Sequence, residues 1–454
     1  MKKLIRSVLV SIMATAVLVS CKPPEDDEQT TSTSDIVLEG NLTTQTLDGS
    51  KKYLLKGLVY VNDGVTLTIP AGTIIKGDKA SKAALVVNRG GKLEANGTAA
   101  NPVIFTSAAP KGYRNAGDWG GIILCGKAKN NQSVNQVIEG PTDFSTTSGN
   151  GVYGGDGTHE DDNSGTLQYV RIEYAGIAYS PDKEINSLTM GSVGSGTTID
   201  HILVSYGGDD SFEWFGGTVD AKYLISYVGY DDDFDTDFGF SGKVQFGVVM
   251  RNRGVADVSQ SNSFESDNDA SGSSNTPKTS AKFSNITVMG PRTFNKSNNS
   301  ANFVQAIHAR RNTEITIANS IVTGFTNMVN FDKYSGTSRL KNNLFAEHNN
   351  STQANASLFV SGNSNDTTGF YAANKWGIKT SVANIFADTI LENGNPVQVS
   401  AGLGLTGADF TATTGLTETF WTSTTYLGAM GTSAASEWNW TSGWLNFAPQ
   451  NTEY

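Results

Sequence analysis

The chain has 454 residues, of which 44 are acidic and 33 are basic, so its formal net charge is −11 at pH 7. A chain of this charge is a poor partner for nucleic acid, because binding to phosphates depends on Lys and Arg side chains. The sequence holds only two cysteines, Cys21 and Cys125.

The first residues have the pattern of a cleaved secretory signal. Three basic side chains open the chain, an apolar stretch runs from Leu4 to Val19, and Ser20 and Cys21 follow. The apolar stretch is shorter than the roughly 20 residues that span a bilayer, so a membrane helix is the weaker interpretation. A cysteine directly after a small residue is the acceptor of a bacterial lipoprotein, and we expect lipidation of Cys21 after removal of residues 1–20. Cys125 would then be the only remaining thiol, so no intramolecular disulfide could form and stability must come from the fold itself.

Residues 21–35 predict a disordered tether between this lipid and a folded domain. Acidic residues cluster shortly after Cys21, and Gln, Thr and Ser follow up to Ser34, with almost no apolar side chain to bury. The cluster resembles the signal that sends Bacteroidota lipoproteins to the outer face of the outer membrane, and a solvated run of charge is the other interpretation. We expect a protein that is anchored in the lipid of the outer membrane and faces the cell exterior.

The rest of the sequence predicts an all-β fold of short strands. It combines 49 glycines with many Asn, Ser and Thr residues and short β-branched runs, without a convincing helical stripe. The apolar runs begin about 20 to 30 residues apart, which is the period of a solenoid. A β-sandwich or jelly roll would instead show hairpins with tight Asn-Gly or Asp-Gly turns. The expected strands include residues 66–69, 84–87, 103–105, 121–124, 167–172, 199–204, 223–225, 244–249, 283–288 and 315–317.

An internal repeat favours a coil with one rung per repeat. A segment that begins at Asp209 is followed by a similar segment that begins at Asp231, and a Phe-acid pair returns at Phe264. Phe234 follows Phe212 by 22 residues, and Phe264 follows Phe234 by 30. A solenoid would stack these phenylalanines in its core and align the acids on neighbouring rungs.

Several motifs resemble the right-handed parallel β-helix lipoproteins of Bacteroidota. Examples are TIPAGTI at 68–74, NPVIFTS at 101–107, GDWGGI at 117–122 and YVRIEYAG at 169–176. The resemblance extends over most of residues 36–454 and implies a right-handed parallel β-helix, but it implies no reaction. We expect this β-helix over residues 36–395. Further similar segments are 231–242, 261–270 and 443–452.

The acidic repeat predicts a cation site. Neighbouring strands lie about 4.8 Å apart, so carboxylates aligned on successive rungs repel one another unless a partner neutralises them. Calcium takes about six to eight oxygen ligands and is the simplest partner. The alternatives are exposed acids, acids that cap their own turns, and ion pairs with Lys243, Arg251 and Arg253. The expected ligands are Asp209, Asp210, Glu213, Asp232, Asp233, Asp235, Asp237, Glu265 and Asp267, with Asp269 as a further candidate.

A second candidate site is the run from His308 to Asn312, which contains two adjacent arginines. Parallel β-helix polysaccharide lyases bind acidic sugars through calcium and abstract a proton with Arg or Lys, so a catalytic role is one interpretation. The favoured interpretation is structural, because an Arg pair at a turn often bridges carbonyls and carboxylates. The other histidines, His159, His201 and His348, lack the spacing of a zinc site.

The tryptophans and one polar loop complete the candidate features. One group lies in strand-like contexts and predicts core packing, namely Trp119, Trp214 and Trp376. Residues 396–454 have weaker repeat character, and we expect them to cap the solenoid, because open strand edges need blocking. For the tryptophans of this region carbohydrate contact is the other interpretation; they are Trp421, Trp438, Trp440 and Trp444. The loop 259–280 predicts either a binding loop or a flap.

Three functional hypotheses follow. The leading one is a non-enzymatic binding or scaffold protein, stabilised by calcium, that associates with a glycan or with a TonB-dependent transporter of the outer membrane. The second is a calcium-dependent polysaccharide lyase or hydrolase, which requires the acids and a basic residue to meet on one face. The third is a structural subunit of an envelope assembly.

Overall fold

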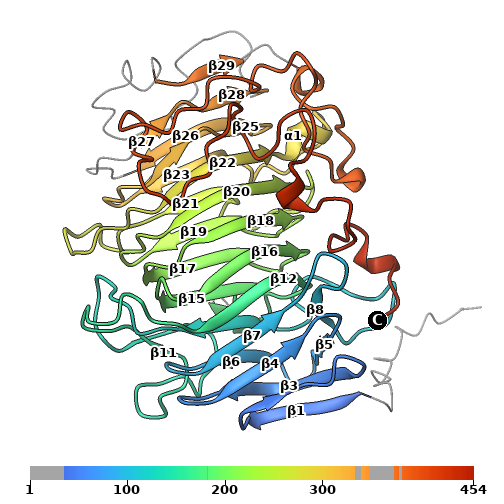
Figure 1. Cartoon of the computed structure of the whole chain (residues 1–454), viewed down its shortest axis with the longest axis vertical. Coiled ribbons are helices and arrows are strands. Elements are labelled where there is room, and N and C mark those ends of the chain that lie inside the picture. Colours follow the sequence, from blue (N-terminus) through green and yellow to red (C-terminus); the bar gives the residue numbers. More distant parts are fainter. Residues whose placement is uncertain (1–34, 181–182, 333–338, 348–372, 378–380) are drawn as a thin grey trace, which may run out of the picture.

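The computed structural model describes residues 35–180, 183–332, 339–347, 373–377 and 381–454. The expected signal peptide, Cys21, nearly all of the tether and His348 therefore lie outside the described residues, as does the side chain of Trp376. The described chain forms an elongated stack of rungs that runs from β1 at one end to β29 at the other (Figure 1). No helix in this part of the chain is long and apolar enough to cross a membrane.

The rungs form a right-handed parallel β-helix, as the sequence predicts. A single network of pairings joins 25 strands, and the pairings within it are parallel. Each turn of the coil supplies strands to three faces, which we call sheets A, B and C, and each residue pairs with its equivalent one rung away.

Sheet A faces the viewer near the middle of Figure 1. Several of its strands are long and continue around a bend into sheet B. The strands of sheet A are β2 (Gln45–Thr46), β4 (Thr66–Pro70), β7 (Lys92–Asn96), the first parts of β12 (Gly165–Glu173), β16 (Thr198–Ser205), β18 (Ala221–Tyr227), β20 (Lys243–Met250) and β22 (Lys282–Met289), then β24 (Thr316–Ala318) and β27 (Arg339–Lys341).

Sheet B continues these long strands. It begins with the first parts of β1 (Ile36–Asn41) and β3 (Lys52–Val61). Its other strands are β5 (Ile74–Gly77), β8 (Val103–Ser107), the second parts of β12, β16, β18, β20 and β22, then β25 (Ile321–Thr323), β28 (Leu344–Ala346) and β29 (Lys375–Gly377).

Sheet C carries the acidic repeat and lies on the left in Figure 1. After the last residues of β1 and β3 it contains β6 (Ala84–Val87), β9 (Gly121–Cys125), β15 (Leu188–Val193), β17 (Phe212–Gly217), β19 (Phe234–Asp237), β21 (Phe264–Ser266), β23 (Gln305–Arg310) and β26 (Asn327–Asp332). Two small antiparallel pairs, β10 (Gln136–Val137) with β11 (Val152–Tyr153) and β13 (Ala178–Ser180) with β14 (Lys183–Glu184), lie outside the sheets. The helical turns are α1 (Pro291–Phe294), η1 (Val382–Asn384), η2 (Leu391–Asn393), η3 (Ser436–Trp438) and η4 (Pro449–Asn451).

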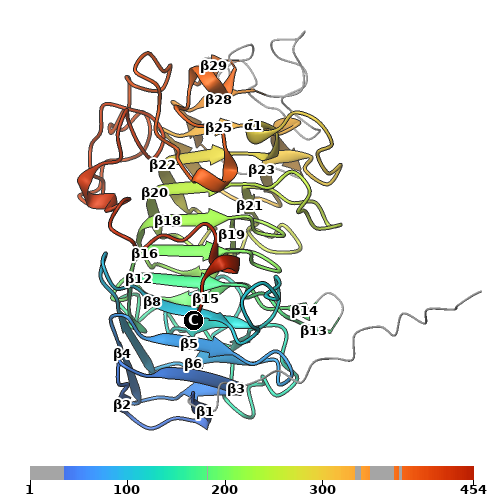
Figure 2. The same ribbon diagram turned by 90° about the vertical axis from the view of Figure 1, so that its right-hand side faces the viewer.

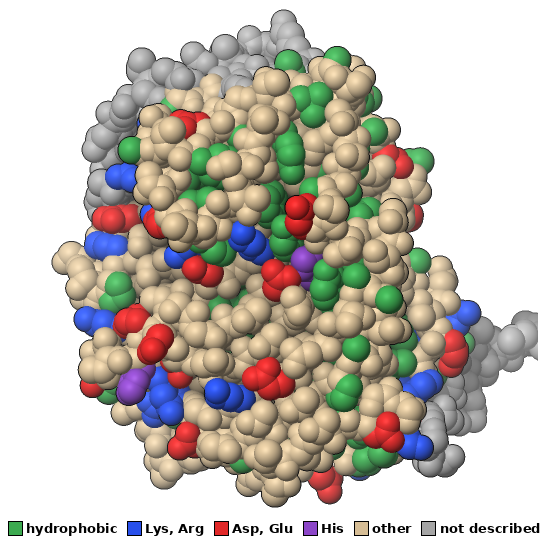
Figure 3. Space-filling view, in the orientation of Figure 1, with side chains coloured by type: hydrophobic (Ala, Val, Ile, Leu, Met, Phe, Trp, Pro, Cys, Tyr) green, Lys and Arg blue, Asp and Glu red, His purple; other side chains and the backbone are tan. Residues whose placement is uncertain are grey.

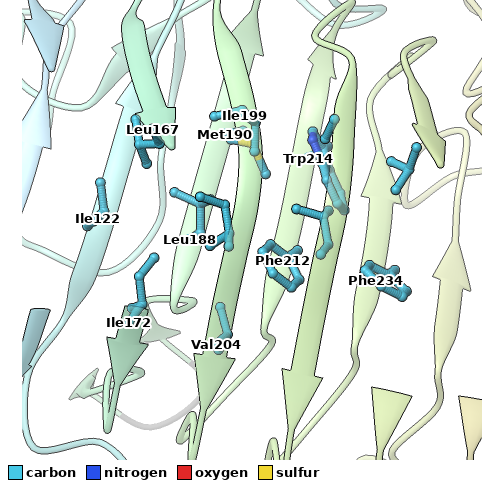
Figure 4. Packing of buried hydrophobic residues seen from close by; sticks show 14 of the residues in the cluster. Ile122, Leu167, Ile172, Leu188, Met190, Ile199, Val204, Phe212, Trp214 and Phe234 are labelled. Carbon is cyan, nitrogen blue, oxygen red and sulfur yellow. The ribbon is translucent and has the colours of Figure 1, made fainter. Parts of the chain in front are cut away.

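The stacked phenylalanines of the repeat lie in the core, as expected. Phe212 pairs with Phe234, and Phe234 pairs with Phe264. Their ring centroids lie 5.7 Å and 5.4 Å apart in turn, and Figure 4 shows the first two rings in line with Leu188 of the preceding rung. Because strand side chains alternate between faces, burial of Phe212 directs the next residue, Glu213, to the outer face of sheet C.

The bend between sheets A and B repeats one backbone conformation. Tyr169, His201, Tyr223 and Phe246 all have a positive φ, between 49° and 65°, which is uncommon for residues other than glycine. The rings stack on one another outside the core, with centroids 4.2 Å apart for Tyr169 and His201 and 4.3 Å apart for His201 and Tyr223. This aromatic stripe needs a cover to exclude water.

Residues 396–454 supply this cover, and we call them the covering segment. We expected them to cap an end of the solenoid, but they run along its side, back towards the N-terminal rungs (Figure 2). Asn439 Nδ2 donates to the hydroxyl of Tyr169 at 2.7 Å, and Arg114 donates to the Pro449 carbonyl at 2.7 Å. Trp438 and Trp444 are fully buried against the stripe. These two rings therefore pack the fold and present no face to a sugar.

A long insertion between β9 and β12 covers part of the outer face of sheet C. Residues 126–164 fold over the outer face of the early rungs, where their apolar side chains pack against Val86, Ile123 and Phe215. Cys125 lies in the same apolar cluster, and burial raises the pKa of its thiol to about 12. On β17 the acid Glu213 shares this outer face with Phe215, and its partners on the next two rungs, Asp235 and Glu265, are also acidic.

Candidate metal site on the outer face of sheet C

The strands of sheet C align acids on three successive rungs. Glu213 pairs with Asp235, Asp235 pairs with Glu265, and Glu265 pairs with His308. Because each pairing joins neighbouring strands, successive side chains are about 4.8 Å apart along the solenoid. The alignment of acids that the repeat predicts is confirmed for these strand positions.

The turns that precede the strands add a second row of acids. Asp210 Oδ1 accepts a hydrogen bond of 2.8 Å from the backbone N–H of Asp232. Asp232 in turn accepts hydrogen bonds from the backbone and the side chain of Asn262. Asp209 and Asp231 occupy equivalent positions one rung apart, next to these buried residues. The turns thus bring further carboxylates to the start of β17 and β19.

Two groups of three carboxylates have the spacing of a metal site. In Asp209, Asp210 and Asp231 one oxygen of each residue lies within 4.8 Å of the others, and the same holds for Asp210, Glu213 and Asp235. Calcium binds oxygens at about 2.3–2.6 Å, so two oxygens on one ion lie at most about 5 Å apart. We call these five residues the acidic column; its two triads share Asp210.

Several oxygens in and beside the column have no partner. Asp231 Oδ1 and Asp235 Oδ1 are buried, and no described residue donates a hydrogen bond to them. Asp267 Oδ1, at the end of β21, is in the same state. Buried polar groups are nearly always hydrogen-bonded or bound to an ion or water. The free oxygens of Asp231 and Asp235 are therefore open to a cation or to water, whereas the other oxygen of Asp267 is already paired with arginine.

Burial and mutual repulsion raise the pKa values of these carboxyls. Burial is the largest cause for Asp210, Glu213 and Asp235, whose pKa values lie well above the ordinary range. The next contribution is a neighbouring carboxylate, which is Asp235 for Glu213 and Glu265 for Asp235. Burial raises the pKa of Asp231 to about 7. The column at neutral pH must either keep protons or bind a cation.

The basic residues of the second candidate site lie at one end of the column. Arg310 Nε is 2.7 Å from Asp267 Oδ2, and the same guanidinium contacts Glu265. His308 Nδ1 lies 3.2 Å from Glu265 Oε2. Burial lowers the pKa of Arg310, but the attraction of Glu265 and Asp267 outweighs burial and raises it. Arg310 therefore neutralises the last rung and is a poor proton acceptor.

Some expected ligands have other roles. Asp233 forms a fully buried ion pair with Arg251, with 2.9 Å between Oδ2 and Nε, so its assignment to the column was wrong. Asp269 accepts hydrogen bonds from Ser271 and Ser273, which outweigh burial and lower its pKa to about 2. Asp269 therefore caps its own turn.

Other acids lie beside the column without joining a triad. Asp232 is satisfied by Asn262, and Asp237 accepts a hydrogen bond of 2.6 Å from the backbone of Phe238. The loop expected at 259–280 is interrupted by β21. Asp231 was missed among the expected ligands, although it stands 22 residues after Asp209 and the repeat could have identified it.

A separate polar hollow of about 210 Å³ lies between sheet A and the covering segment. Lys243 and Lys282 line it from neighbouring strands. Both are already paired, Lys243 with Asp220 at 3.0 Å and Lys282 with Glu418. Figure 3 shows that charged side chains on this side of the molecule are scattered among uncharged ones.

A family model described as a pectate-lyase-like beta helix domain matches residues 40–444. The chain belongs to this family. No curated protein and no solved structure matches it significantly. The match ends at Trp444 of this pectate-lyase-like β-helix. The family domain therefore includes most of the covering segment as well as the three sheets. The acidic column lies well within the matched range.

Proposed function

We propose that this protein is a non-enzymatic surface lipoprotein that binds calcium in the acidic column and holds an acidic glycan through that calcium. The observation that carries the proposal is the convergence of Asp210, Glu213 and Asp235 within 4.8 Å without a cationic side chain. Among the residues that the structure describes, no Lys or Arg forms an ion pair with any of these three.

The coordination number of calcium explains why a glycan would bind there. The ion takes about six to eight oxygen ligands, and a triad supplies one oxygen from each of three residues. The remaining positions are open to water or to the carboxylate and hydroxyl oxygens of an acidic sugar. Asp209, Asp231 and Asp235 are partly exposed, so a ligand can reach the column from outside.

The expected lipid anchor at Cys21 supports a location at the outer membrane. The tether of residues 21–35 would hold the β-helix away from the lipid surface, where it meets external polysaccharide. A TonB-dependent transporter in the same membrane would be a suitable protein partner for a glycan-binding lipoprotein.

A calcium-dependent polysaccharide lyase is the second candidate. The family description and the position of Arg310 beside the acids favour it. Glu265 and Asp267 raise the pKa of Arg310, however, and a catalytic base needs a pKa near the working pH. A binding role therefore fits the geometry better than a lyase role does.

Calorimetry on the folded chain without residues 1–21 tests the proposal. Calcium should bind to the wild type, and Asp210→Asn should abolish binding because Asp210 belongs to both triads. Asp220→Asn is the matched control, since Asp220 pairs with Lys243 on sheet A. Absence of calcium binding in the wild type would contradict the proposal.

The glycan is tested next with oligogalacturonate, added in calcium and in EGTA. Binding should require calcium and should disappear in Asp210→Asn. Appearance of an unsaturated, ultraviolet-absorbing product would instead establish the lyase. Equal binding in calcium and EGTA would contradict the calcium-mediated mode.

A further inference from the structure

We propose that a hollow at the corner between sheets B and C binds one neutral sugar unit and needs no cation to do so. This corner hollow has a volume of about 270 Å³ and lies among the turns that follow β20 and β22 and residues 389–392. Pockets for small molecules begin at about 300 Å³, so its size suits a single sugar ring. Figure 1 shows α1, which contributes to the hollow, on the right, whereas sheet C lies on the left. The inference therefore goes beyond the proposed function, which depends on the acidic column.

One wall of the corner hollow belongs to the rigid rungs. β20 pairs with β22 up to their last residues, so the two turns leave neighbouring rungs side by side. Arg251 donates its backbone N–H to the Met289 carbonyl at 3.0 Å, and its side chain is fully buried in the ion pair with Asp233. Gly290 precedes α1, and a Cβ at this position would lie only 2.4 Å from the Thr323 carbonyl oxygen. Because these contacts fix the turns, the hollow is largely formed before a ligand arrives.

Apolar side chains supply a surface for the C–H face of a sugar ring. Phe294 of α1 packs against the apolar cluster that contains Leu391, and both residues line the corner hollow together with Pro291 and Ile390. Ile390 is 56% exposed, so part of this surface meets water in the free protein. A bound ring would remove apolar surface from water, and an aromatic side chain contributes most to such contacts.

Two asparagines supply hydrogen-bond donors. The side-chain oxygen of Asn252 accepts a hydrogen bond of 2.9 Å from the backbone N–H of Gly254, and that of Asn295 accepts one of 3.0 Å from Ser297. Both asparagines line the corner hollow, and within the described chain neither Nδ2 group donates a hydrogen bond. These amide groups are therefore available to the hydroxyl oxygens of a sugar.

One cation and one anion also line the corner hollow, namely Arg253 and Glu392. Among the residues that the structure describes, neither forms an ion pair, and the Arg253 guanidinium donates only to the Ser297 carbonyl, at 2.8 Å from Nη1. A sugar hydroxyl both donates and accepts, so it can use the guanidinium as donor and the carboxylate as acceptor. A charged ligand would meet one like charge beside one opposite charge. The pair therefore favours a neutral sugar over a uronate.

Saturation-transfer NMR on the folded chain without residues 1–21, recorded in EGTA, tests the site. The probes are the methyl hexopyranosides of glucose, galactose and mannose, with methyl galacturonide as the charged comparison. A neutral probe should bind more tightly than the uronide. Arg253→Gln and Glu392→Gln should each weaken its binding about tenfold, because each removes a charged hydrogen-bond partner. Glu437→Gln is the matched control, since Glu437 is exposed and lies outside the corner hollow, and it should change nothing.

The outcomes separate this inference from the proposed function. Absence of saturation transfer to all three neutral sugars would overturn it, and so would equal binding by the wild type and the two pocket variants. Tighter binding of the uronide, lost in Arg253→Gln, would also overturn it, because the hollow would then select an anion. EGTA removes calcium in each of these measurements, so none of these results affects the calcium site, which calorimetry tests separately.

Discussion

In calcium-free buffer, the stability of the protein should fall as the pH rises from about 5 to about 8. Asp231 carries the effect that can be worked out best, because burial raises its folded pKa to about 7 from an ordinary 3.8. Above pH 3.8 the unfolded chain releases this proton whereas the folded chain keeps it. Since the folded state binds more protons in this interval, the free energy of unfolding decreases with pH and levels off above pH 7.

The pKa values give the size of the change. Because the unfolded carboxyl is already ionised at pH 5, a folded pKa of about 7 lowers the free energy of unfolding by about 3 kcal/mol between pH 5 and pH 8. For a domain of roughly 400 residues this is a decrease of about 3 °C in Tm. The carboxyls with lowered pKa values do not change the stability in this pH interval. Asp269 and Glu418, both with a pKa of about 2, contribute stability that is complete above pH 5 and is lost only in stronger acid.

Thermal denaturation in EGTA at a series of pH values measures this effect. Asp231→Asn should show a smaller decrease between pH 5 and 8 than the wild type, because its side chain does not titrate. Calcium should restore the wild-type Tm at pH 8, since the ion stabilises the ionised carboxylates. A wild-type Tm that stays constant or rises with pH in EGTA would refute the reasoning.

Three further predictions concern packing and location. Arg251→Met should cost about 3–5 kcal/mol in urea unfolding, because it leaves the buried Asp233 carboxylate without its partner; a loss under 1 kcal/mol would contradict the role of the pair. Tyr454→Phe should cost about 1–3 kcal/mol, since its hydroxyl donates to the buried Glu173 carboxylate at 2.8 Å, whereas Tyr113→Phe at an exposed site should change nothing. Cys21→Ala should move the protein from the membrane to the soluble fraction, and unchanged fractionation would exclude lipidation at this residue.

The sequence predicted the alignment of the acids because a solenoid converts spacing along the chain into height along the axis. Phe212 and Phe234 mark the core position of each rung, so the residue after each phenylalanine faces outwards. The longer interval to Phe264 reflects the long turn that precedes β21, which does not disturb the register. Strand positions and outward acids therefore follow from local pattern alone.

Contacts between segments far apart in the sequence decided which acids form ion pairs and which surface of the solenoid is covered. Asp233 left the predicted site because it meets Arg251, and Glu265 and Asp267 are neutralised because Arg310 lies two strand residues beyond His308 on the next rung. The covering segment lies along the side because the stacked rings at the bend between sheets A and B need a cover. Local sequence sets which side of a strand a residue faces. The choice of ion partner and of covered surface depends on which groups the complete coil brings together, and burial then sets the charge that each group can carry.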